Sequence, residues 1–175
     1  MRRFNLPVVF LVLAATSWAA PVGAQSQTFR VSEPSRRPGI SFGVTQLHER
    51  YGDGRGVELD LLLGTVKHLG IVVDGSLNNF DGFSELTLMG GVRWTLRRDA
   101  ALSPFAQLLA GIERCGACET TDPTVEPAAG VDLAITHSHR VSLRIAAGYR
   151  ITPSDVRTFK ETHVFVGFSV RPGER

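Results

Sequence analysis

Residues 141–151 have the sequence V-S-L-R-I-A-A-G-Y-R-I, in which apolar side chains alternate strictly with small or charged ones. The apolar positions are Val141, Leu143, Ile145, Ala147, Tyr149 and Ile151. A period of two is the signature of a β-strand with two unlike faces. About ten residues is also the length that a tilted strand needs to cross a bilayer. This stretch therefore predicts one strand of a membrane-spanning barrel.

Alternation of this kind recurs in eight segments of the chain. They are residues 40–47, 57–66, 69–78, 85–96, 104–113, 125–135, 141–151 and 163–170. An even number of strands suits an up-and-down barrel with both termini on one side. We therefore predict an all-β fold, an eight-stranded antiparallel up-and-down transmembrane β-barrel, over residues 39–172.

The N-terminal residues have the features of an export signal. Arg2 and Arg3 are followed by an apolar run at 6–15 and by small residues at 22–24. This order predicts a signal peptide over residues 1–24 that is cleaved before Gln25. Export together with the predicted barrel implies a location in the outer membrane. A retained anchor helix is the alternative. Residues 25–38 are polar and contain two prolines, so we expect a flexible N-terminal lead-in.

Two bulk properties exclude other classes of protein. The net charge of +2 is too small to indicate a nucleic-acid partner. After the N-terminus no apolar run approaches the roughly 20 residues of a transmembrane helix.

The connections between the predicted strands differ in length. Longer ones, rich in Gly, Asp, Pro or Thr, occur at 48–56, 79–84, 114–124 and 152–162, whereas 67–68 and 137–139 are short and 97–103 is intermediate. Outer-membrane barrels have short periplasmic turns and longer outer loops. The first, third, fifth and seventh connections are therefore expected to face away from the cell.

The charged residues of the strands share one parity with most of the strand glycines. We predict a polar network in the lumen that consists of Glu58, Asp60, Asp74, Arg93, Glu113, Glu126, Asp132, Arg144 and Arg150; Glu85 and Arg171 share this parity. The glycines of the set are Gly43, Gly64, Gly70, Gly91, Gly111, Gly130, Gly148 and Gly167. Because Lys or Arg on a lipid-facing surface costs about 2–4 kcal/mol, the uncharged apolar face is the one expected to contact lipid. A soluble periplasmic barrel, which hides its apolar face inside, is the alternative.

A register follows if residues 137–139 form a three-residue turn. It places Thr136 opposite Arg140, Asp132 opposite Arg144, and Glu126 opposite Arg150, and opposite charges across an antiparallel pair are favourable. Side chains fill the interior of an eight-stranded barrel. We therefore expect a lumen closed by ion pairs and not the open channel of a general porin.

The turns contain three motifs that require a chemical interpretation. Cys115-Gly116-Ala117-Cys118 predicts a disulfide in an exported protein, with free thiols, metal binding or redox activity as alternatives. The segment 137–139 (His-Ser-His) resembles part of a nucleophile-and-base site, but a turn at the periplasmic end predicts a solvated segment. Asp53 lies in a Gly-rich stretch that lacks the further oxygen ligands of a calcium loop, so we expect a simple turn.

Five aromatic residues lie near the predicted strand ends, where aromatic residues of membrane interfaces gather. They are Phe80, Phe83, Trp94, Phe105 and Tyr149. Ordinary packing is the alternative explanation for them.

The second half of the chain resembles a bacterial family, the small outer-membrane β-barrel-domain proteins. The stretches that carry the likeness are L-M-G-G-V-R-W (88–94), S-P-F-A-Q-L-L-A-G (103–111), A-A-G-V-D-L-A (128–134) and V-S-L-R (141–144). The wider fold is similar to the transmembrane domain of outer-membrane protein A. The resemblance implies a fold and a location but no activity. The chain departs from such proteins at its end, where Phe168 is followed by further residues and not by a chain terminus.

From these features we expect a small non-catalytic barrel with a structural, adhesion or surface-interaction role. We expect no enzyme activity, no catalytic residues, no cofactor and no metal. The expected partners are outer-membrane lipid and, during insertion, the outer-membrane assembly machinery, with no nucleic acid; the protein is expected to be a monomer. The alternatives are a lipid-modifying enzyme of the outer membrane and a soluble, lipocalin-like binding barrel of the periplasm.

Overall fold

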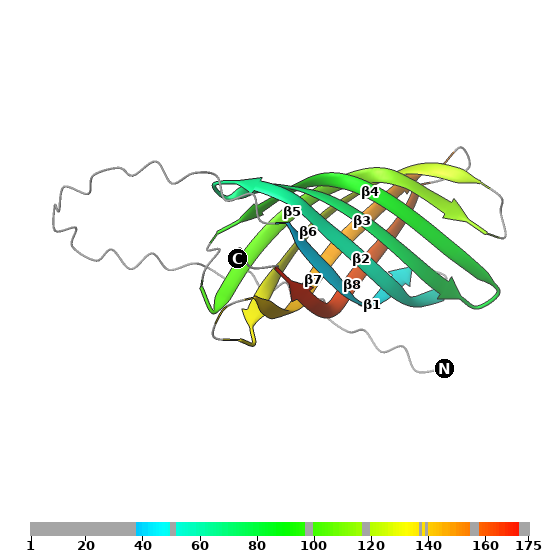
Figure 1. Cartoon of the computed structure of the whole chain (residues 1–175). Helices are drawn as coiled ribbons and strands as arrows, with labels where there is room; N and C mark the ends of the chain where they lie inside the picture. The colour runs from blue at the N-terminus through cyan, green and yellow to red at the C-terminus, as the bar shows by residue number, and fades with distance from the viewer. Residues whose placement is uncertain are drawn as a thin grey trace, which may run out of the picture. The chain divides into compact units, whose positions relative to one another are not determined.

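The computed structural model describes residues 38–49, 52–96, 100–116, 120–136, 138, 140–154 and 158–171. The predicted signal peptide and all of the lead-in except Pro38 lie outside these residues. The described part forms eight strands (Figure 1): β1 (Gly39–Glu49), β2 (Gly52–Val66), β3 (Leu69–Phe80), β4 (Phe83–Thr95), β5 (Leu102–Cys115), β6 (Thr121–Ala134), β7 (Val141–Pro153) and β8 (Thr158–Val170). Among the described residues no helix is long and apolar enough to cross a membrane.

The strands form one closed barrel. Each strand pairs antiparallel with the next in sequence, and β8 pairs with β1. The predicted all-β, eight-stranded antiparallel fold is therefore confirmed. The predicted register of β6 and β7 is also confirmed, because Asp132 lies directly opposite Arg144.

The strands extend further than predicted at one end of the barrel. Most of the predicted loops 48–56, 114–124 and 152–162 belong to strands, and the β3–β4 connection is a two-residue turn at Asp81–Gly82. The predicted alternation of loop lengths is therefore wrong. Asp53 is likewise in β2, opposite His48, and not in a turn. The strands continue past the end of the apolar pattern. In this part of the barrel most of the outward side chains are polar, but the backbone hydrogen bonds between strands are still made.

The outward side chains change from apolar to polar at one end of the barrel, and the apolar alternation in the sequence stops there. At the end of the barrel with the β1–β2, β3–β4, β5–β6 and β7–β8 connections, most of the exposed side chains are polar. They are Gln46, His48, Asp53, Arg55, Asn79, Ser84, Arg114, Thr121, Thr158, Lys160 and Thr162. We call this the polar end.

Next to the polar end, an apolar belt begins on the outer surface and continues to the other end of the barrel. There the exposed side chains include Val66, Leu69, Trp94, Leu96, Leu102 and Ile135. The belt is about as tall as the hydrocarbon core of a bilayer, since nine to eleven residues of each tilted strand span such a core. At the polar end the strands continue beyond the belt.

One glycine faces the opposite way from the prediction. The β2–β3 ladder shifts register between Leu62 and Gly64, so that Gly64 pairs with the outward-facing Ile71. A β-bulge adds one residue to one strand and thereby inverts the parity that follows it. Gly64 therefore belongs to the outer face, and the inward position passes to Thr65, which is buried.

The interior is mostly polar and contains a small apolar patch. Leu62, Val72, Met89 and Leu109 form this patch. In another part of the wall, Gly43 on β1 and Gly167 on β8 lie directly opposite each other. The two strands approach each other closely there. A Cβ atom on Gly167 would collide with the Cα of Gly43 and with the ring of Phe165, so glycine is required there.

Candidate functional site

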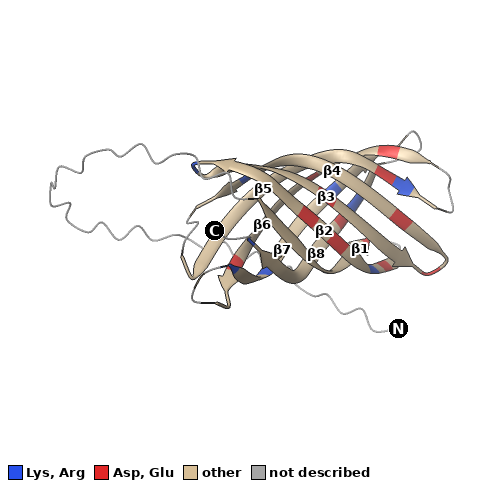
Figure 2. Ribbon diagram, viewed as in Figure 1, with Lys and Arg blue, Asp and Glu red and all other residues tan. Residues whose placement is uncertain are grey.

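All nine residues of the predicted lumen network lie buried inside the barrel. Their exposed fractions range from 0% for Arg150 to 9% for Glu113. Figure 2 shows charged positions along the strands and at their ends. Since the strands form a single-layered closed wall whose outer belt is apolar, these buried charges line the lumen. Glu85, which shares their parity, is also buried.

The first ionic cluster lies toward the end opposite the polar end. Arg144 donates to Asp132 at 2.7 and 2.9 Å and to Asp60 at 3.0 Å. Asp60 also accepts from Arg93, which in turn contacts Gln107. Arg171 completes the cluster with a 2.9 Å contact to Asp132. The alternating charges connect β2, β4, β6 and β7 across the lumen.

Phe105 lies within this cluster and not at the membrane interface, which corrects the prediction. Its ring is 5% exposed, and the guanidinium carbons of Arg93 and Arg144 lie 4.6 and 4.9 Å from the ring centroid. Cation–π attraction explains why an aromatic residue occupies this inward position.

The other four aromatic residues divide into two pairs. Phe80 and Phe83 stack on each other at the β3–β4 turn with centroids 4.7 Å apart. Trp94 and Tyr149 point outward and are 49% and 43% exposed, as interfacial residues would be.

A second cluster occupies the middle of the barrel. Nε2 of His163 lies 2.9 Å from Glu58, and its Nδ1 lies 2.7 Å from Glu126. Glu126 also accepts from Arg150 at 3.0 Å, so the predicted pair of Glu126 and Arg150 makes contact. His163 was not predicted as part of the network, although it shares the inward parity of Gly167 on β8 and could have been found by that signal.

Asp74 differs from the other buried charges. It is 1% exposed, and neither carboxylate oxygen has a hydrogen-bond partner among the described residues. It also lies directly opposite Asp60 across the β2–β3 ladder. Two acidic groups in this position repel each other when both are ionised.

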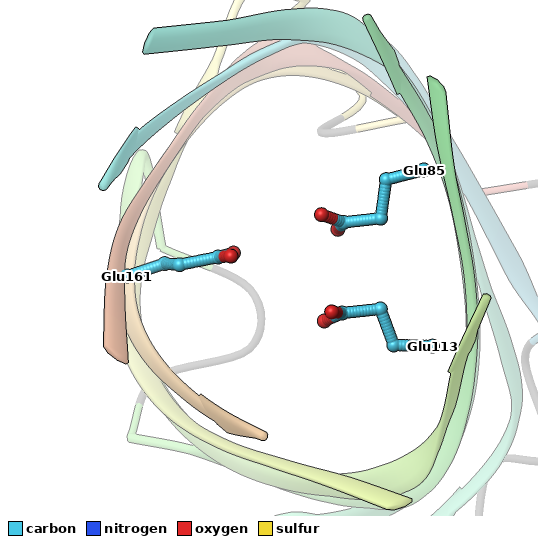
Figure 3. Close-up of side chains that lie close together, drawn as sticks. All are labelled: Glu85, Glu113 and Glu161. Carbon is cyan, nitrogen blue, oxygen red and sulfur yellow. The ribbon is translucent and has the colours of Figure 1, made fainter. Parts of the chain in front are cut away.

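A third cluster lies at the polar end and is acidic. Arg150 donates to Glu85 at 2.8 Å, and Thr152 donates to Glu113 at 2.9 Å. Glu161 reaches the same region from β8, and Figure 3 shows the three glutamates pointing toward one another. Glu161 was assigned to a loop in the prediction, and it became visible as a site residue only when β8 was seen to begin at Thr158.

The other two motifs of the connections lie partly outside the described residues. Cys115 ends β5, whereas Cys118 lies outside the described residues, so the disulfide stays a prediction. His137 and His139 also lie outside them. Between the two, Ser138 is exposed and donates to Thr136 at 3.3 Å.

Comparison with known sequences finds no relative: no protein-family model matches the chain, and no curated protein matches it. Comparison with solved structures is informative. Neisserial surface protein A superimposes with a TM-score of 0.61 at 13% identity, covering 78% of this chain and 96% of that one. The fold is that of the small outer-membrane β-barrels.

Two further structures agree with this result. The outer membrane protein OprG from Pseudomonas aeruginosa gives a TM-score of 0.59 at 9% identity and covers 81% of this chain and 98% of its own. The Yersinia pestis outer membrane protein Ail, in a phospholipid bilayer nanodisc, gives 0.50 at 14% identity, with coverage of 78% and 99%. At such identities the likeness concerns the fold alone. The resemblance to the domain of outer-membrane protein A stays a prediction.

Proposed function

We propose that this protein is a small, non-catalytic barrel of the bacterial outer membrane that acts as a structural or surface-contact element through its polar end. One observation carries this proposal: the arrangement of side chains is inverted relative to a soluble barrel. Residues such as Ile145 and Val166 are 40% and 41% exposed, whereas Asp132 and Arg144 are each 3% exposed. An exposed apolar surface of this extent is expected to contact lipid.

The same inversion disfavours the soluble binding barrel. A lipocalin-like protein needs an apolar cavity that opens to its ligand. Here the buried ion pairs of Asp60, Arg93, Arg144 and Asp132 extend across the lumen and connect β2, β4, β6 and β7. This packing also favours a closed barrel over a pore.

The lipid-modifying enzyme is supported by one feature only. His48 and Asp53 lie on the outer surface of the polar end, with Nδ1 and Oδ1 2.5 Å apart, which resembles the base and orienting carboxylate of a hydrolase. Their side chains are 73% and 54% exposed, and no hydroxyl group of the described residues bonds to the His48 ring. Without a positioned nucleophile the pair is better explained as a surface contact.

Location is tested by membrane fractionation combined with a heat-modifiability gel. We expect the protein in the outer-membrane fraction and a change in its mobility after boiling, because a closed barrel resists detergent until heated. Recovery in the soluble periplasmic fraction, with no mobility change, would refute the proposal.

Orientation and surface display need a second experiment. A protease recognition sequence inserted after Gly82, in the β3–β4 turn, should be cut when protease is added to intact cells. The same sequence inserted after Ser138, at the other end, is the matched control and should be cut only after lysis. The reverse pattern would place the polar end in the periplasm and remove the basis for a surface-contact role.

A further inference from the structure

The acidic cluster of Glu85, Glu113 and Glu161 has the properties of an ion site. We infer that it binds one divalent cation, calcium in preference to magnesium, inside the polar end of the barrel. Each glutamate offers one carboxylate oxygen, and these oxygens lie within 4.8 Å of one another. In Figure 3 Glu85 and Glu113 extend from neighbouring strands, and Glu161 extends toward them from the opposite wall.

Cross-strand neighbours add to the negative charge of this cluster. Glu49 lies directly opposite Glu161 on β1, and Asp122 lies directly opposite Glu113 on β6. Like charges in such positions destabilise an antiparallel pair. Two such pairs at one end of a closed barrel indicate that an additional positive charge is bound between them.

Arg150 supplies only part of that charge. It donates to Glu85 and to Glu126, and it lies directly opposite Glu161 across the β7–β8 ladder, so three carboxylates share its single charge. Even if its whole charge is assigned to the cluster, three ionised carboxylates and one guanidinium leave two negative charges, and Glu49 and Asp122 add to this excess. A divalent cation offsets more of the excess than a monovalent one.

An unpartnered atom points to the same conclusion. Glu161 is 3% exposed, and its Oε2 has no hydrogen-bond partner among the described residues, although the side chain is directed into the cluster. Buried carboxylate oxygens are normally satisfied. A bound cation would satisfy this one.

The other two carboxylates are already oriented for binding. Oε1 of Glu85 accepts from Arg150 and from Thr87, and Oε2 of Glu113 accepts from Thr152. Each of these glutamates therefore has its second oxygen left to bind an ion. Such supporting hydrogen bonds are how proteins fix the ligands of a metal.

The ligand type and the spacing select the ion. Carboxylate oxygens suit calcium, magnesium or manganese and not the softer metals. Calcium binds oxygen at about 2.3–2.6 Å, so two of its ligands can lie about 5 Å apart, whereas the roughly 2.1 Å bonds of magnesium limit the separation to about 4.2 Å. Separations within 4.8 Å are in reach of calcium, whose coordination geometry is also more flexible than the near-ideal octahedron that magnesium demands.

Isothermal titration of calcium chloride into detergent-folded protein, depleted of metal beforehand, tests this inference. We expect one calcium per chain, and a higher unfolding temperature in calcium than in sodium chloride of equal ionic strength. Magnesium chloride should bind more weakly. The variant Thr152→Val, which removes the support of Glu113, should bind calcium about 10–100-fold more weakly.

The variant Glu161→Gln keeps the shape of the side chain and should abolish calcium binding. Asp74→Asn is the matched control, because it alters a buried carboxylate at another level of the lumen and should leave calcium binding unchanged. If Glu161→Gln does not fold, Glu113→Gln serves in its place.

Two results would overturn the inference. The first is a wild type without calcium binding, and the second is calcium binding that survives in Glu161→Gln.

Discussion

Asp132 and Arg144 face each other directly across the β6–β7 ladder and are joined by two parallel hydrogen bonds of 2.7 and 2.9 Å. Both side chains are nearly inaccessible to solvent. A two-bonded arginine–carboxylate pair fixes geometry more strictly than a single contact. This pair therefore defines how two strands align, and through Asp60 it also connects them to the opposite side of the wall.

Replacing Arg144 by Met should destabilise the barrel by about 3–5 kcal/mol, because it leaves buried carboxylates without their cation. The change is measured by urea unfolding in detergent or lipid. Arg114→Met, at an exposed position of the polar end, is the control and should change the free energy of unfolding by no more than about 0.5 kcal/mol. Equal losses in the two variants would contradict a structural role of the lumen network.

Ile145→Arg should cost about 2–4 kcal/mol of folding free energy in lipid vesicles, because Ile145 is an exposed apolar residue within the interior of β7. Gln46→Arg, on the outward face of the polar end, should cost only about 0–1 kcal/mol. Both values come from reversible folding into the same vesicles. If Ile145→Arg were as harmless as Gln46→Arg, the apolar belt would not contact lipid.

Gly167→Ala should destabilise the β1–β8 seam by about 1–3 kcal/mol through overpacking. Its Cβ would collide with backbone atoms of β1, which cannot move aside as a flexible side chain can. Gly90→Ala is the matched control, because a Cβ there makes only an ordinary contact at 3.8 Å. The thermal midpoints of the two variants should therefore differ clearly, and similar midpoints would argue against close packing at the seam.

Phe105→Leu should destabilise the protein more than the loss of volume explains, because two guanidinium groups lose their aromatic partner. Phe165→Leu is the comparison for volume, since that ring is also buried. We expect an additional loss of about 1–2 kcal/mol at position 105, in the range of desolvated cation–π contacts. Identical unfolding curves for the two variants would indicate simple packing.

Much of this fold could be predicted from local sequence. Alternation reports which face each residue occupies, and so it located Asp132, Arg144 and the other buried charges of the strands. It also gave the β6–β7 register, because a slip of one residue would move every charge to the apolar face. The face that a residue occupies and the register of two consecutive strands both depend on residues that are close in sequence.

Features that depend on other strands could not be predicted in this way. The bulge at Leu62–Gly64 inverts parity without any change in the hydrophobic pattern, because the run of leucines there is apolar on both faces. Phe105 was misassigned since an aromatic residue near a strand end fits lipid and lumen equally well. The acidic cluster required knowing that β4, β5 and β8 meet in space and that their ends continue past the apolar belt.

The pairing of the first strand with the last has a consequence for assembly of the barrel. Residues that are partners across this seam, such as Phe42 and Phe168, are separated by almost the whole barrel sequence. Until β8 has paired with β1, any partial wall carries two open edges that invite association with other chains. A nascent chain truncated before β8 therefore cannot complete itself, which gives a cell a simple physical criterion for distinguishing finished copies from fragments.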